Sequence, residues 1–465
     1  MIYSDLREWI TDLDKHGELL RIKEEINLES DVGAIGQACR AVNGPGILAE
    51  RIHGYKDARL SIYLPGSLQR AGMALGLSKE ASPREQKEVW LRAYEKYPAK
   101  PRIITREKAP CKENILRGDE INLFNFPIPR LNTVDAAPYI TKTLCITRDP
   151  DSDWINFGMF RMMVLDRNKT GIFTSHSSHW GQHYIKSRRQ GKPLEMVVAL
   201  GTDPVLSMVS GVRIPSGWKE FDFAGALRGE PVKVTMAESV DLPVPATAEI
   251  ILEGTVTPDA DIIEGPFGEF TGAYSGASIT PAFNITTVTH RNNPIFDTVY
   301  VGCGTDDRWM VIMPECAVLE QELKRISPSV TQVSYLLPDY LNCVVQGKWL
   351  NKTEPRRIMS AVWASEADPQ SKMVTVVDED IDPWNAEEVM WAIATRCQAN
   401  TDIVTIPGAH CRLDPSTETD DTTCLFGIDA TKSIEPHPRH IISEWITPRK
   451  ETEAWKDKIL KLMKK

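Results

Sequence analysis

Residues 262–276 read IIEGPFGEFTGAYSG and place two glutamates, Glu264 and Glu269, on either side of a Gly-Pro-Phe-Gly bend. Pro266 does not fit inside a regular helix, so the stretch predicts a strand end, a tight turn and a return. Phe267 can pin this turn into a core. Two carboxylates held close together repel, which raises one pKa and lets that acid donate a proton near neutral pH. A hairpin with both glutamates in solvent is the plain alternative.

The chain on both sides of this bend consists of short β-rich runs separated by turn residues. They include YITKTLCITRD, LEMVVALG, AEIILEGTVT and AFNITTVTHR. This pattern is typical of a mostly antiparallel barrel or sandwich. Helical and strand-like patterns alternate at both ends of the chain. The sequence therefore predicts an α+β fold with an α/β domain over 1–108, a β-rich domain over 109–312 and an α/β domain over 313–465.

Polar residues at three positions predict where helices begin. Ser4 and Ser82 precede helical patterns, and Asn385 stands three residues before Glu388 in capping-box spacing. At the end of the chain, ETEAWKDKILKLMKK repeats apolar residues at helical spacing. A terminal amphipathic helix of this kind is expected to dock on its own chain or on a partner subunit.

Composition excludes several classes of protein. A net charge of -10 argues against nucleic-acid binding, which needs a basic surface. No apolar run reaches the roughly 18 residues of a membrane span, and the first residues lack the pattern of a signal peptide. The nine cysteines form no C-x-x-C pair and are odd in number, which suits buried thiols in a reducing compartment. We therefore expect a cytoplasmic protein without a membrane partner.

The run WINFGMFRMMVLD contains Asn156 and Arg161, five residues apart. Along a regular strand these two side chains would point to opposite faces, unless a bulge or turn lies between them. An arginine among apolar residues needs a partner. It can grip a substrate carboxylate with its guanidinium fork, or it can belong to a structural ion pair.

Histidines and acidic residues provide further candidates. His176, His179 and His183 would share one face of a helix and could bind zinc, although the serines and glycine nearby argue against a helix that includes His176. Glu220 precedes an aromatic-rich run, where a surface glutamate opening a helix is the simpler interpretation. The acidic run VVDEDIDPWN is explained by a strand end leading into a helix N-terminus, with a metal site as the alternative.

Taken together, these stretches resemble the UbiD family of decarboxylases, which use prenylated FMN. The resemblance spans nearly the whole chain in order, and VPATAEIILEG followed by EGPFGE is its most specific part. It implies a split β-barrel domain that binds the flavin over 109–312 and a C-terminal α/β oligomerisation domain. The residues that carry it are NFGMFR (156–161), SSHWG (177–181), KEFDFAGALRGEPV (219–232), VPATAEIILEGTV (244–256) and EGPFGEFTGAY (264–274).

The resemblance implies a metal site and a cofactor site. Asn156, His179 and Glu220 would bind Mn²⁺ or Mg²⁺, which bridges to the cofactor phosphate. A K⁺ ion near the carbonyls of residues 210–212 is a further implication, and Lys372 is the candidate for a phosphate contact. Trp180 stands where relatives often carry a basic or apolar residue. The residues implied to contact prenylated FMN are Met159, Phe160, Arg161, Ser175, His176, Ser177, Trp180 and Gly181.

The resemblance also implies a catalytic group of Arg161, Glu264 and Glu269. Arg161 would orient the substrate carboxylate, Glu264 would order Arg161, and Glu269 would stay free to carry a proton. The reaction would be reversible, non-oxidative decarboxylation through a covalent adduct with the cofactor. The expected substrate is a hydroxybenzoate-type acid, with α,β-unsaturated acids such as cinnamate and heteroaromatic acids as alternatives. The pocket wall would include 303–307 and His437. A flavin prenyltransferase would supply the cofactor, and a homodimer or homohexamer is expected.

Three other functions stay open at this point. An FMN-binding split-barrel oxidoreductase would share the barrel, but no dinucleotide fingerprint is present. A zinc hydrolase would use the three histidines. The chain could also be a non-catalytic subunit of a multi-subunit carboxylase.

Overall fold

The computed structural model has a mixed α+β fold, as the sequence predicts. It describes residues 2–173, 175–302, 306–336, 341–365, 371–410, 413–417, 422–433 and 451–463. The chain divides into two compact units. The first contains Met1–Val318 and two short later segments, and the second contains most of the remainder. The domain boundaries at residues 108 and 312 stay predictions.

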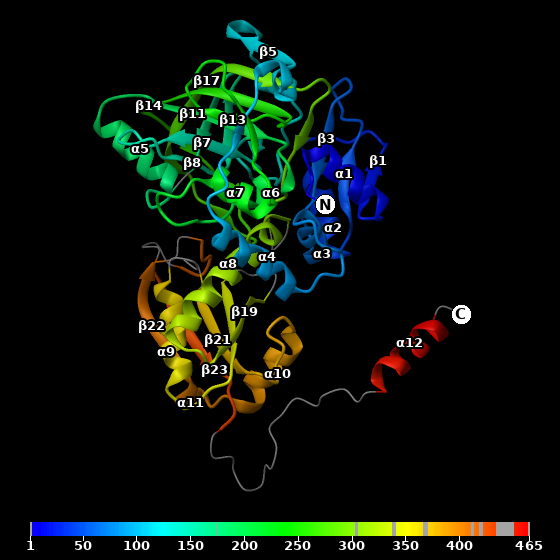
Figure 1. Ribbon diagram of the computed structural model, residues 1–465, viewed down its shortest axis with the longest axis vertical. Coiled ribbons are helices and arrows are strands. Elements are labelled where there is room, and N and C mark those ends of the chain that lie inside the picture. Colours follow the sequence, from blue (N-terminus) through cyan, green and yellow to red (C-terminus); the bar gives the residue numbers. More distant parts are fainter. Residues whose placement is uncertain are drawn as a thin grey trace. The chain divides into compact units, whose positions relative to one another are not determined.

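The first unit begins with a small four-stranded sheet, in the strand order β1-β2-β3-β18, and with helices around it (Figure 1). Asp5 caps the first helix by accepting the backbone N–H of Glu8, so the prediction of Ser4 was one residue too early. Ser82 forms the predicted cap of α4, reciprocated by Glu85. The elements are α1 (Leu6–Lys15), β1 (Leu19–Ile22), α2 (Asp31–Ala41), β2 (Gly46–Ala49), β3 (Arg59–Ile62), α3 (Leu68–Ala74), α4 (Pro83–Lys96) and β18 (Ile295–Asp297).

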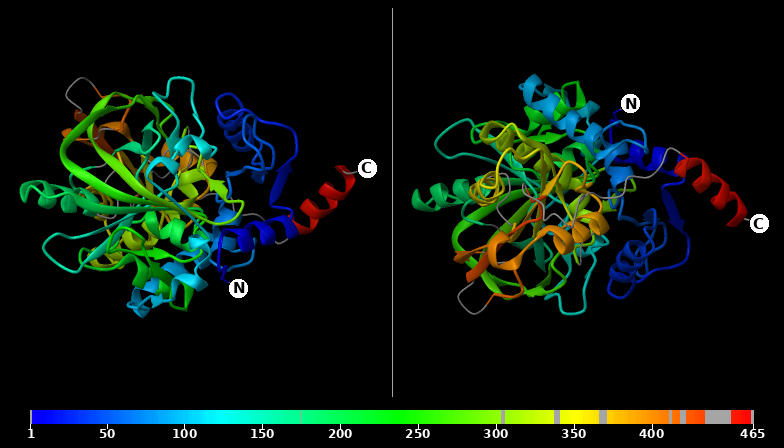
Figure 2. Two further views of the ribbon diagram at one scale, coloured as in Figure 1. Left: turned by 90° about the horizontal axis from the view of Figure 1, so that it is seen from above. Right: turned by 90° about the horizontal axis from the view of Figure 1, so that it is seen from below.

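A nine-stranded sheet forms the centre of this unit. Its strands follow the order β6-β9-β10-β17-β14-β11-β7-β8, with β5 paired to β17, and all their pairings are antiparallel. The long strands bend round to form part of a barrel wall (Figure 2). The strands are β5 (Asn114–Arg117), β6 (Tyr139–Ile140), β7 (Leu144–Arg148), β8 (Ile155–Gly158), β9 (Met162–Asp166), β10 (Lys169–Ile172), β11 (Leu194–Leu200), β14 (Ile250–Glu264) and β17 (Ser278–His290).

Shorter elements surround the central sheet. Three helices pack near its strands, and they are α5 (His179–Arg189), α6 (Pro204–Ser210) and α7 (Glu220–Arg228). Two small sheets complete the unit, formed by β4 (Arg102–Ile103), β12 (Lys233–Met236) and β13 (Pro243–Pro245), and by β15 (Phe267–Gly268) and β16 (Tyr274–Ser275). Helix α5 begins at His179 with Ser178 as its cap, so His176 lies outside the helix, as the sequence indicated.

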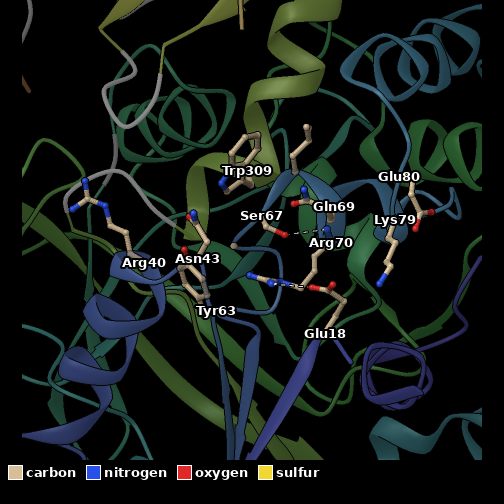
Figure 3. Close-up of a pocket in the computed structure, with 12 residues that line it drawn as sticks. Glu18, Arg40, Asn43, Tyr63, Ser67, Gln69, Arg70, Lys79, Glu80 and Trp309 are labelled. Carbon is tan, nitrogen blue, oxygen red and sulfur yellow. Dashed lines mark hydrogen bonds and ion pairs between the residues drawn. The ribbon is translucent and has the colours of Figure 1, made fainter. Parts of the chain in front are cut away.

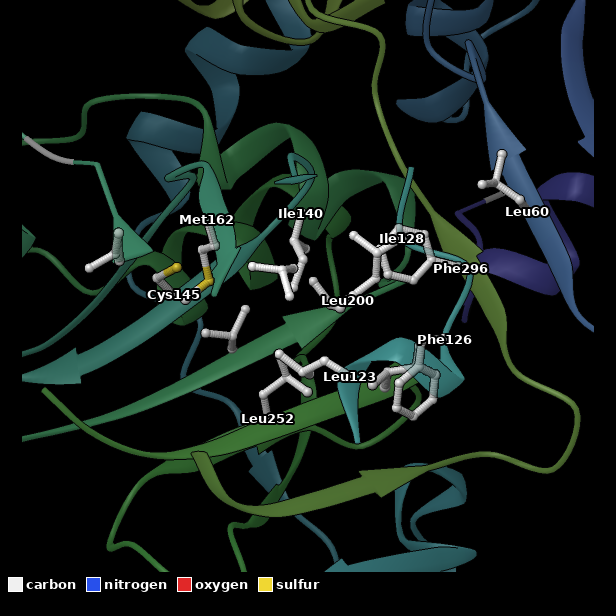
Figure 4. Close-up of a cluster of buried hydrophobic side chains, with 14 of the residues drawn as sticks. Leu60, Leu123, Phe126, Ile128, Ile140, Cys145, Met162, Leu200, Leu252 and Phe296 are labelled. Atoms are coloured by element: carbon white, nitrogen blue, oxygen red, sulfur yellow. The ribbon is translucent and has the colours of Figure 1, made fainter. Parts of the chain in front are cut away.

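One hydrophobic core joins the small sheet to the central sheet. Leu60 and Phe296 belong to the small sheet, whereas Met162, Leu200 and Leu252 belong to the central one, and all are buried in the same cluster (Figure 4). Because buried apolar area is the main stabilising term in folding, a shared core makes the two sheets fold as one body. The candidate site described below is therefore built on a rigid framework.

The second unit contains a five-stranded sheet in the order β19-β20-β21-β23-β22. Asn385 caps α10 as predicted. In the acidic run, Asp378 and Asp380 pair with Arg396 from the end of that helix, so this charge is structural. The elements are β19 (Val330–Tyr335), β20 (Asn342–Gly347), α9 (Glu354–Ala364), β21 (Met373–Asp378), α10 (Ala386–Arg396), α11 (Ala399–Asp402), β22 (Ile403–His410) and β23 (Thr422–Asp429), with α8 (Asp306–Ile326) preceding them across the unit boundary.

The predicted terminal helix is present as α12 (Thr452–Met463). Its apolar stripe of Trp455, Ile459 and Leu462 is more than half exposed. Its docking on a partner therefore stays a prediction. Among the residues that the structure describes, no helix is both long and apolar enough to cross a bilayer.

Candidate active site

Arg161 lies in a three-residue break between two strands. Strand β8 ends at Gly158 and β9 begins at Met162, so Asn156 and Arg161 do not share one regular strand. Thr143 stabilises the break, because its hydroxyl accepts the N–H of Phe160 at 2.9 Å and donates to the carbonyl oxygen of Phe160 at 2.7 Å. Of the two options that the spacing left open, a regular strand and an interrupted one, the structure has the interrupted one.

Arg161 binds both glutamates of the opening stretch. Its Nε donates to Oε1 of Glu264 at 2.9 Å and its Nη2 to Oε2 of Glu264 at 3.0 Å. Its Nη1 donates to Glu269, and Nη2 also reaches the hydroxyl of Ser275 at 3.2 Å. The expectation that Glu269 stays free is therefore wrong in this state. A guanidinium has five N–H donors, and the fork that holds Glu264 leaves Nη1 for the second carboxylate.

The turn between the glutamates is built as the sequence predicts. Strand β14 ends at Glu264, and Gly265 adopts a positive φ of 92° that favours glycine, before the cis peptide bond to Pro266. Phe267 is buried against Tyr139, with ring centroids 4.6 Å apart. Glu264 is fully buried and Glu269 is 8% exposed, so the alternative of a solvated hairpin is wrong.

The surroundings of Arg161 keep it charged. Burial lowers its pKa, but hydrogen bonds and charges from Glu264 and Glu269 more than offset that effect and raise the pKa above its ordinary value. The guanidinium carbon also lies 4.0 Å from the ring centre of Phe173 and 4.5 Å from that of Phe267. One cation thus holds two carboxylates and lies against two aromatic rings. A substrate carboxylate that binds Arg161 must replace one of the two carboxylates.

Asn156, His179 and Glu220 form a second cluster, which joins β8, α5 and α7. The amide nitrogen of Asn156 lies 3.3 Å from Nδ1 of His179 and donates to Oε1 of Glu220. Nδ1 of His179 lies 4.0 Å from the same Glu220 oxygen. Glu220 is 2% exposed, so its interpretation as a surface residue is wrong. The three residues implied as metal ligands therefore lie together.

The donor set of this cluster fits a divalent cation. Glu220 accepts from Asn156 and from the N–H of Phe157 at 3.1 Å, which are both neutral groups. Burial raises the pKa of Glu220 to about 8, and these hydrogen bonds lower it only in part. A carboxylate, an amide and an imidazole offer the oxygen and nitrogen ligands that Mn²⁺ accepts. A bound cation would supply the positive charge that this buried carboxylate needs.

The three-histidine zinc site is not formed. His183 is fully buried, its Nδ1 lies 2.9 Å from the hydroxyl of Thr147, and burial lowers its pKa to about 4. His176 is exposed and precedes the helix. Within the described part of the chain, no group of three or more His, Cys, Asp or Glu side chains could hold a metal ion. The indole of Trp154 instead lies edge-on to both His179 and His183.

The residues implied to contact the flavin fall into two sets. Met159, Phe160 and Arg161 occupy the break before β9, and Met159 N–H donates to the carbonyl oxygen of Ser210 at 2.7 Å. Ser175, His176, Ser177 and Gly181 lie at the start of α5, where the hydroxyls of Ser175 and Ser177 are 2.8 Å apart. Trp180 is fully buried in the shared core and donates to the sulfur of Met196 at 3.1 Å. These contacts with the cofactor stay predictions.

Several other predicted positions give less information. Lys372 lies just before β21 in the second unit, and its phosphate contact stays a prediction. The predicted pocket wall falls largely outside the described residues, because residues 303–305 and His437 are not among them.

A cavity of about 810 Å³ opens beside the small sheet of the first unit (Figure 3). Buried Arg70 lies on its wall and donates to the carbonyl oxygens of Leu64 at 2.8 Å and Gly44 at 3.1 Å. None of the predicted site residues lines this cavity, which is thus distinct from the Arg161 cluster. Its labelled wall residues are Glu18, Arg40, Asn43, Tyr63, Ser67, Gln69, Arg70, Lys79, Glu80 and Trp309.

Sequence reasoning missed the residues that support the site. Ser275 and Thr143 hold Arg161 and the break before it, and Tyr139 packs under the turn. Asp135 accepts the N–H of Gly268. Ser275 stands inside the opening stretch, so the polar residue in GAYSG was a usable signal. The others are distant in sequence and carry no local pattern that links them to the turn.

Comparison with known proteins identifies the class. Residues 102–304 match the family described as the 3-octaprenyl-4-hydroxybenzoate carboxy-lyase Rift-related domain. Residues 10–90 and 308–430 match the N-terminal and C-terminal domains of the same enzyme. The class is therefore that of a carboxy-lyase. The chain belongs to the UbiD family, and the resemblance inferred from its motifs is confirmed.

Individual relatives extend this result along the full chain. A phenolic acid decarboxylase of Sedimentibacter hydroxybenzoicus is 35% identical and covers 100% of this chain and 98% of its own length. The vanillic acid decarboxylase structure from that organism, in closed form, has a TM-score of 0.87 at 34% identity, with 100% of each chain covered. An evolved dimeric form of HmfF from Pelotomaculum thermopropionicum, in complex with prFMN, has a TM-score of 0.84 at 29% identity and covers 97% of this chain and 98% of its own. The oxidoreductase and zinc-hydrolase alternatives are set aside by family membership.

Proposed function

We propose that this chain catalyses the reversible, non-oxidative decarboxylation of a hydroxybenzoate-type aromatic acid with prenylated FMN. The observation that carries the proposal is the buried guanidinium of Arg161 held between Glu264 and Glu269. The relative named phenolic acid decarboxylase supports an aromatic acid, and the prFMN complex of HmfF supports the cofactor. An α,β-unsaturated acid is the second substrate class.

Arg161 is the residue that binds the substrate carboxylate. It holds Glu264 through two parallel hydrogen bonds and Glu269 through Nη1 alone. A bidentate pair is harder to replace than a single contact. The incoming carboxylate therefore takes the Nη1 side and displaces Glu269, while Glu264 keeps the guanidinium oriented. The contact between Arg161 and Glu269 is thus the resting state of the site.

After Arg161 has released Glu269, this glutamate carries the proton. When the bond between the ring carbon and the carboxylate breaks, carbon dioxide leaves and the electron pair stays behind. The Glu269 carboxylate that Arg161 has released takes up a proton from water, and this proton then passes from its carboxyl oxygen to the carbon that lost the carboxylate. In carboxylation the same transfer runs in reverse. The 8% exposure of Glu269 leaves a route for that exchange with water.

The cofactor and metal have defined places in this proposal. Prenylated FMN would supply the electron sink for the reaction. Asn156, His179 and Glu220 would hold Mn²⁺ or Mg²⁺ at the phosphate of that cofactor. Met159 and Phe160, in the break before β9, would line the flavin ring. A K⁺ ion at the carbonyls of residues 210–212 would lie close to this break, because Ser210 accepts the N–H of Met159.

The same proposal includes the cellular location, the supply of the cofactor and the oligomeric state. Its cysteines are free thiols in the described residues, and five of them are buried, which supports a reducing cytoplasm. A flavin prenyltransferase would supply the cofactor. The exposed apolar stripe of α12 supports a homodimer or homohexamer.

One experiment tests the function directly. The chain is co-expressed with a flavin prenyltransferase, and cofactor mass and metal content are measured on the purified protein. Release of CO₂ from 4-hydroxybenzoate, vanillate and cinnamate is then followed, with deuterium uptake into product in D₂O. We expect CO₂ release from 4-hydroxybenzoate and vanillate, and no release by chain expressed without the prenyltransferase. Stoichiometric cofactor without CO₂ release from any acid would overturn the proposal.

A second candidate is a subunit that is active only with another component. One related structure is described as vanillic acid decarboxylase ShVdcCD with truncated ShVdcD. That description concerns the relative, but it makes the test specific. Turnover by the purified single chain excludes a required partner, whereas activity that appears only when a cell extract is added supports one.

A further inference from the structure

We propose that Asp135 is a positioning residue for this reaction, because its buried carboxylate anchors the turn that carries Glu264 and Glu269. The inference rests on the proposed function, since it concerns where the proton-carrying glutamate stands. Asp135 belongs to none of the motifs that define the family resemblance. It lies between the short helical turn that ends at Asn125 and strand β6.

The carboxylate of Asp135 joins two backbone segments. Its Oδ1 accepts the N–H of Gly268 at 2.8 Å, and its Oδ2 accepts the N–H of Asn132 at 2.9 Å. Gly268 is the residue directly before Glu269. Asp135 is 2% exposed, and burial raises its pKa while the backbone hydrogen bonds lower it. Its partners in the described structure are backbone N–H groups, so the side chain serves to fix a main-chain position.

Further contacts tie the same two segments together. Ala136 N–H donates to the carbonyl oxygen of Pro266 at 2.9 Å, and Val134 N–H donates to the hydroxyl of Tyr274 at 3.3 Å. Gly268 also packs so closely that a Cβ atom there would lie 2.4 Å from Nδ2 of Asn132. The segment over 132–136 therefore contacts the turn before, at and after Gly268, with no room for a larger residue.

The anchor continues toward the small sheet of the first unit. Tyr300 donates its hydroxyl to Oδ1 of Asn132 at 3.4 Å, and Nε2 of Gln37 on α2 donates to the same hydroxyl at 3.0 Å. Asn132 in turn donates to the carbonyl oxygen of Val301 at 3.4 Å. Asp135 and Asn132 thus connect the turn to the shared core. The position of the turn does not depend on its own strands alone.

Glu269 depends on this anchor more than Glu264 does. Glu264 ends a long strand whose last four residues, Asp261 to Glu264, are paired with β17. Glu269 lies beyond β15, in a tight turn closed by its N–H to the carbonyl oxygen of Ala273 at 2.9 Å. Once Arg161 releases it, the position of its backbone sets the range that its carboxyl group can reach. A displacement of 1 Å in a reacting group can cost about 100-fold in rate, so a loosened Gly268 is expected to lower kcat.

The test compares variants on both sides of one hydrogen bond. Asp135→Ala removes both acceptors, whereas Asp135→Asn keeps one acceptor oxygen. Gly268→Ala perturbs the same contact from the other side. Asp119→Ala is the control, because Asp119 is an exposed aspartate upstream in the same connection. All variants are loaded with cofactor, and kcat, KM, metal content and flavin content are measured.

The expected result is selective for turnover. Asp135→Ala and Gly268→Ala should lower kcat by about 10- to 100-fold with KM changed less than about threefold. Metal and flavin content should match the wild type, since Asn156, His179 and Glu220 are not touched. Asp135→Asn should recover most of the loss. Wild-type kcat in Asp135→Ala would overturn the inference, and so would a loss that Asp135→Asn does not relieve and that follows cofactor content.

A readout independent of activity separates this inference from the proposed function. Hydrogen exchange over residues 266–275, measured by mass spectrometry, should be at least about tenfold faster in Asp135→Ala than in the wild type. If the wild type releases no CO₂, the proposed function fails, and faster exchange still establishes the anchor. If the wild type is active and neither exchange nor kcat changes, the positioning role is refuted.

Discussion

Two buried glutamates in this chain face opposite electrostatic situations. Glu264 is fully buried and paired twice with the guanidinium of Arg161. Glu220 is buried almost as deeply, at 2% exposed, but it accepts hydrogen bonds from neutral groups. Burying an ionised carboxylate is costly unless a positive charge or strong donors compensate.

This difference distinguishes the Arg161 cluster, which contains its own cation, from the Glu220 cluster, for which we propose a bound cation. The chain carries its own cation for Glu264, so the Arg161 cluster can exist without any bound group. In the described part of the chain, the groups that donate hydrogen bonds to Glu220 are the neutral amide of Asn156 and the N–H of Phe157, and burial raises the pKa of Glu220 to about 8. We therefore propose that chemistry using the protein's own charges belongs to the first cluster, and that cation binding belongs to the second. Each prediction below alters one side of this contrast.

The largest effect is expected from Arg161→Ala. It leaves Glu264 buried without a cation and removes the substrate anchor. Breaking one partner of a buried pair typically costs 3–5 kcal/mol, so the free energy of unfolding should fall by about that amount. CO₂ release should fall at least about 1,000-fold, because both binding and orientation are lost. Urea denaturation and steady-state kinetics measure the two effects.

The control for Arg161→Ala is Arg84→Ala, whose exposed pair with Glu88 should contribute less than about 1 kcal/mol. A chain that keeps wild-type stability after Arg161→Ala would show that Glu264 can be accommodated without its cation. That result would remove the contrast between the two glutamates.

Glu269→Gln is expected to affect turnover alone. The amide keeps the shape of the side chain and can still contact Arg161, but it cannot deliver a proton. The rate of CO₂ release should fall by about 100- to 10,000-fold, which is the usual contribution of general acid–base catalysis. Deuterium exchange into product should stop with it, while cofactor and metal remain bound. Wild-type exchange in this variant would assign the proton to another group, and Glu88→Gln serves as an exposed control.

The sequence predicted the parts of the site that lie within one motif, and it failed where the outcome depends on distant contacts. The strand end, the turn and the burial of Phe267 follow from the Gly-Pro-Phe-Gly bend itself. The pairing of Glu269 with Arg161 does not, because it depends on how a break over 100 residues earlier is packed. Glu220 was interpreted as a surface residue for the same reason. Its carboxylate contacts residues of β8 and lies near His179 at the start of α5, and no local pattern connects those elements to α7.

The family resemblance supplied what local patterns could not, since it grouped Asn156, His179 and Glu220 from three separate elements. The error at the first helix is of a different kind. Both Ser4 and Asp5 are good caps, and only the backbone geometry decides that Asp5 accepts from Glu8. Asp135 shows the limit of both approaches, because it acts through main-chain groups of another segment and belongs to no motif.

His183, which lies near the Glu220 cluster, predicts that the free energy of unfolding depends on pH. Burial lowers its pKa to about 4, from an ordinary value of 6.5. Between these two values the unfolded chain binds a proton that the folded chain does not, so the free energy of unfolding falls as the pH falls. The full effect is roughly 3 kcal/mol, since one pKa unit corresponds to about 1.4 kcal/mol. Stability gained from a neutral His183 should be complete above pH 6.5 and lost toward pH 4.

The measurement is urea denaturation of metal-free chain at several pH values. His183→Asn should flatten the slope between pH 6.5 and 4, even if it lowers stability at all pH values. His53→Asn, with a side chain that is 70% exposed, should leave the slope unchanged. An equal slope in wild type and His183→Asn would mean that His183 takes up its proton in the folded state. The assignment of a neutral His183 ring beside Trp154 would then need revision.

Asn156→Ala gives the smallest expected effect and the sharpest distinction between the clusters. It removes one ligand and the amide that contacts Glu220 and His179. Mn²⁺ affinity should fall by at least about 10- to 100-fold, as it does when a supporting group of a metal site is lost. Retention of the flavin should fall with it, if the ion holds the cofactor phosphate.

Asn114→Ala is a matched control on β5, where the amide bonds to the carbonyl oxygen of His290 instead. Metal content by mass spectrometry and flavin absorbance give both values from one preparation, so parallel losses would join ion and cofactor in one site. Loss of metal with full flavin retention would separate them, and Glu220 would then balance its charge with a cation that has no part in holding the flavin.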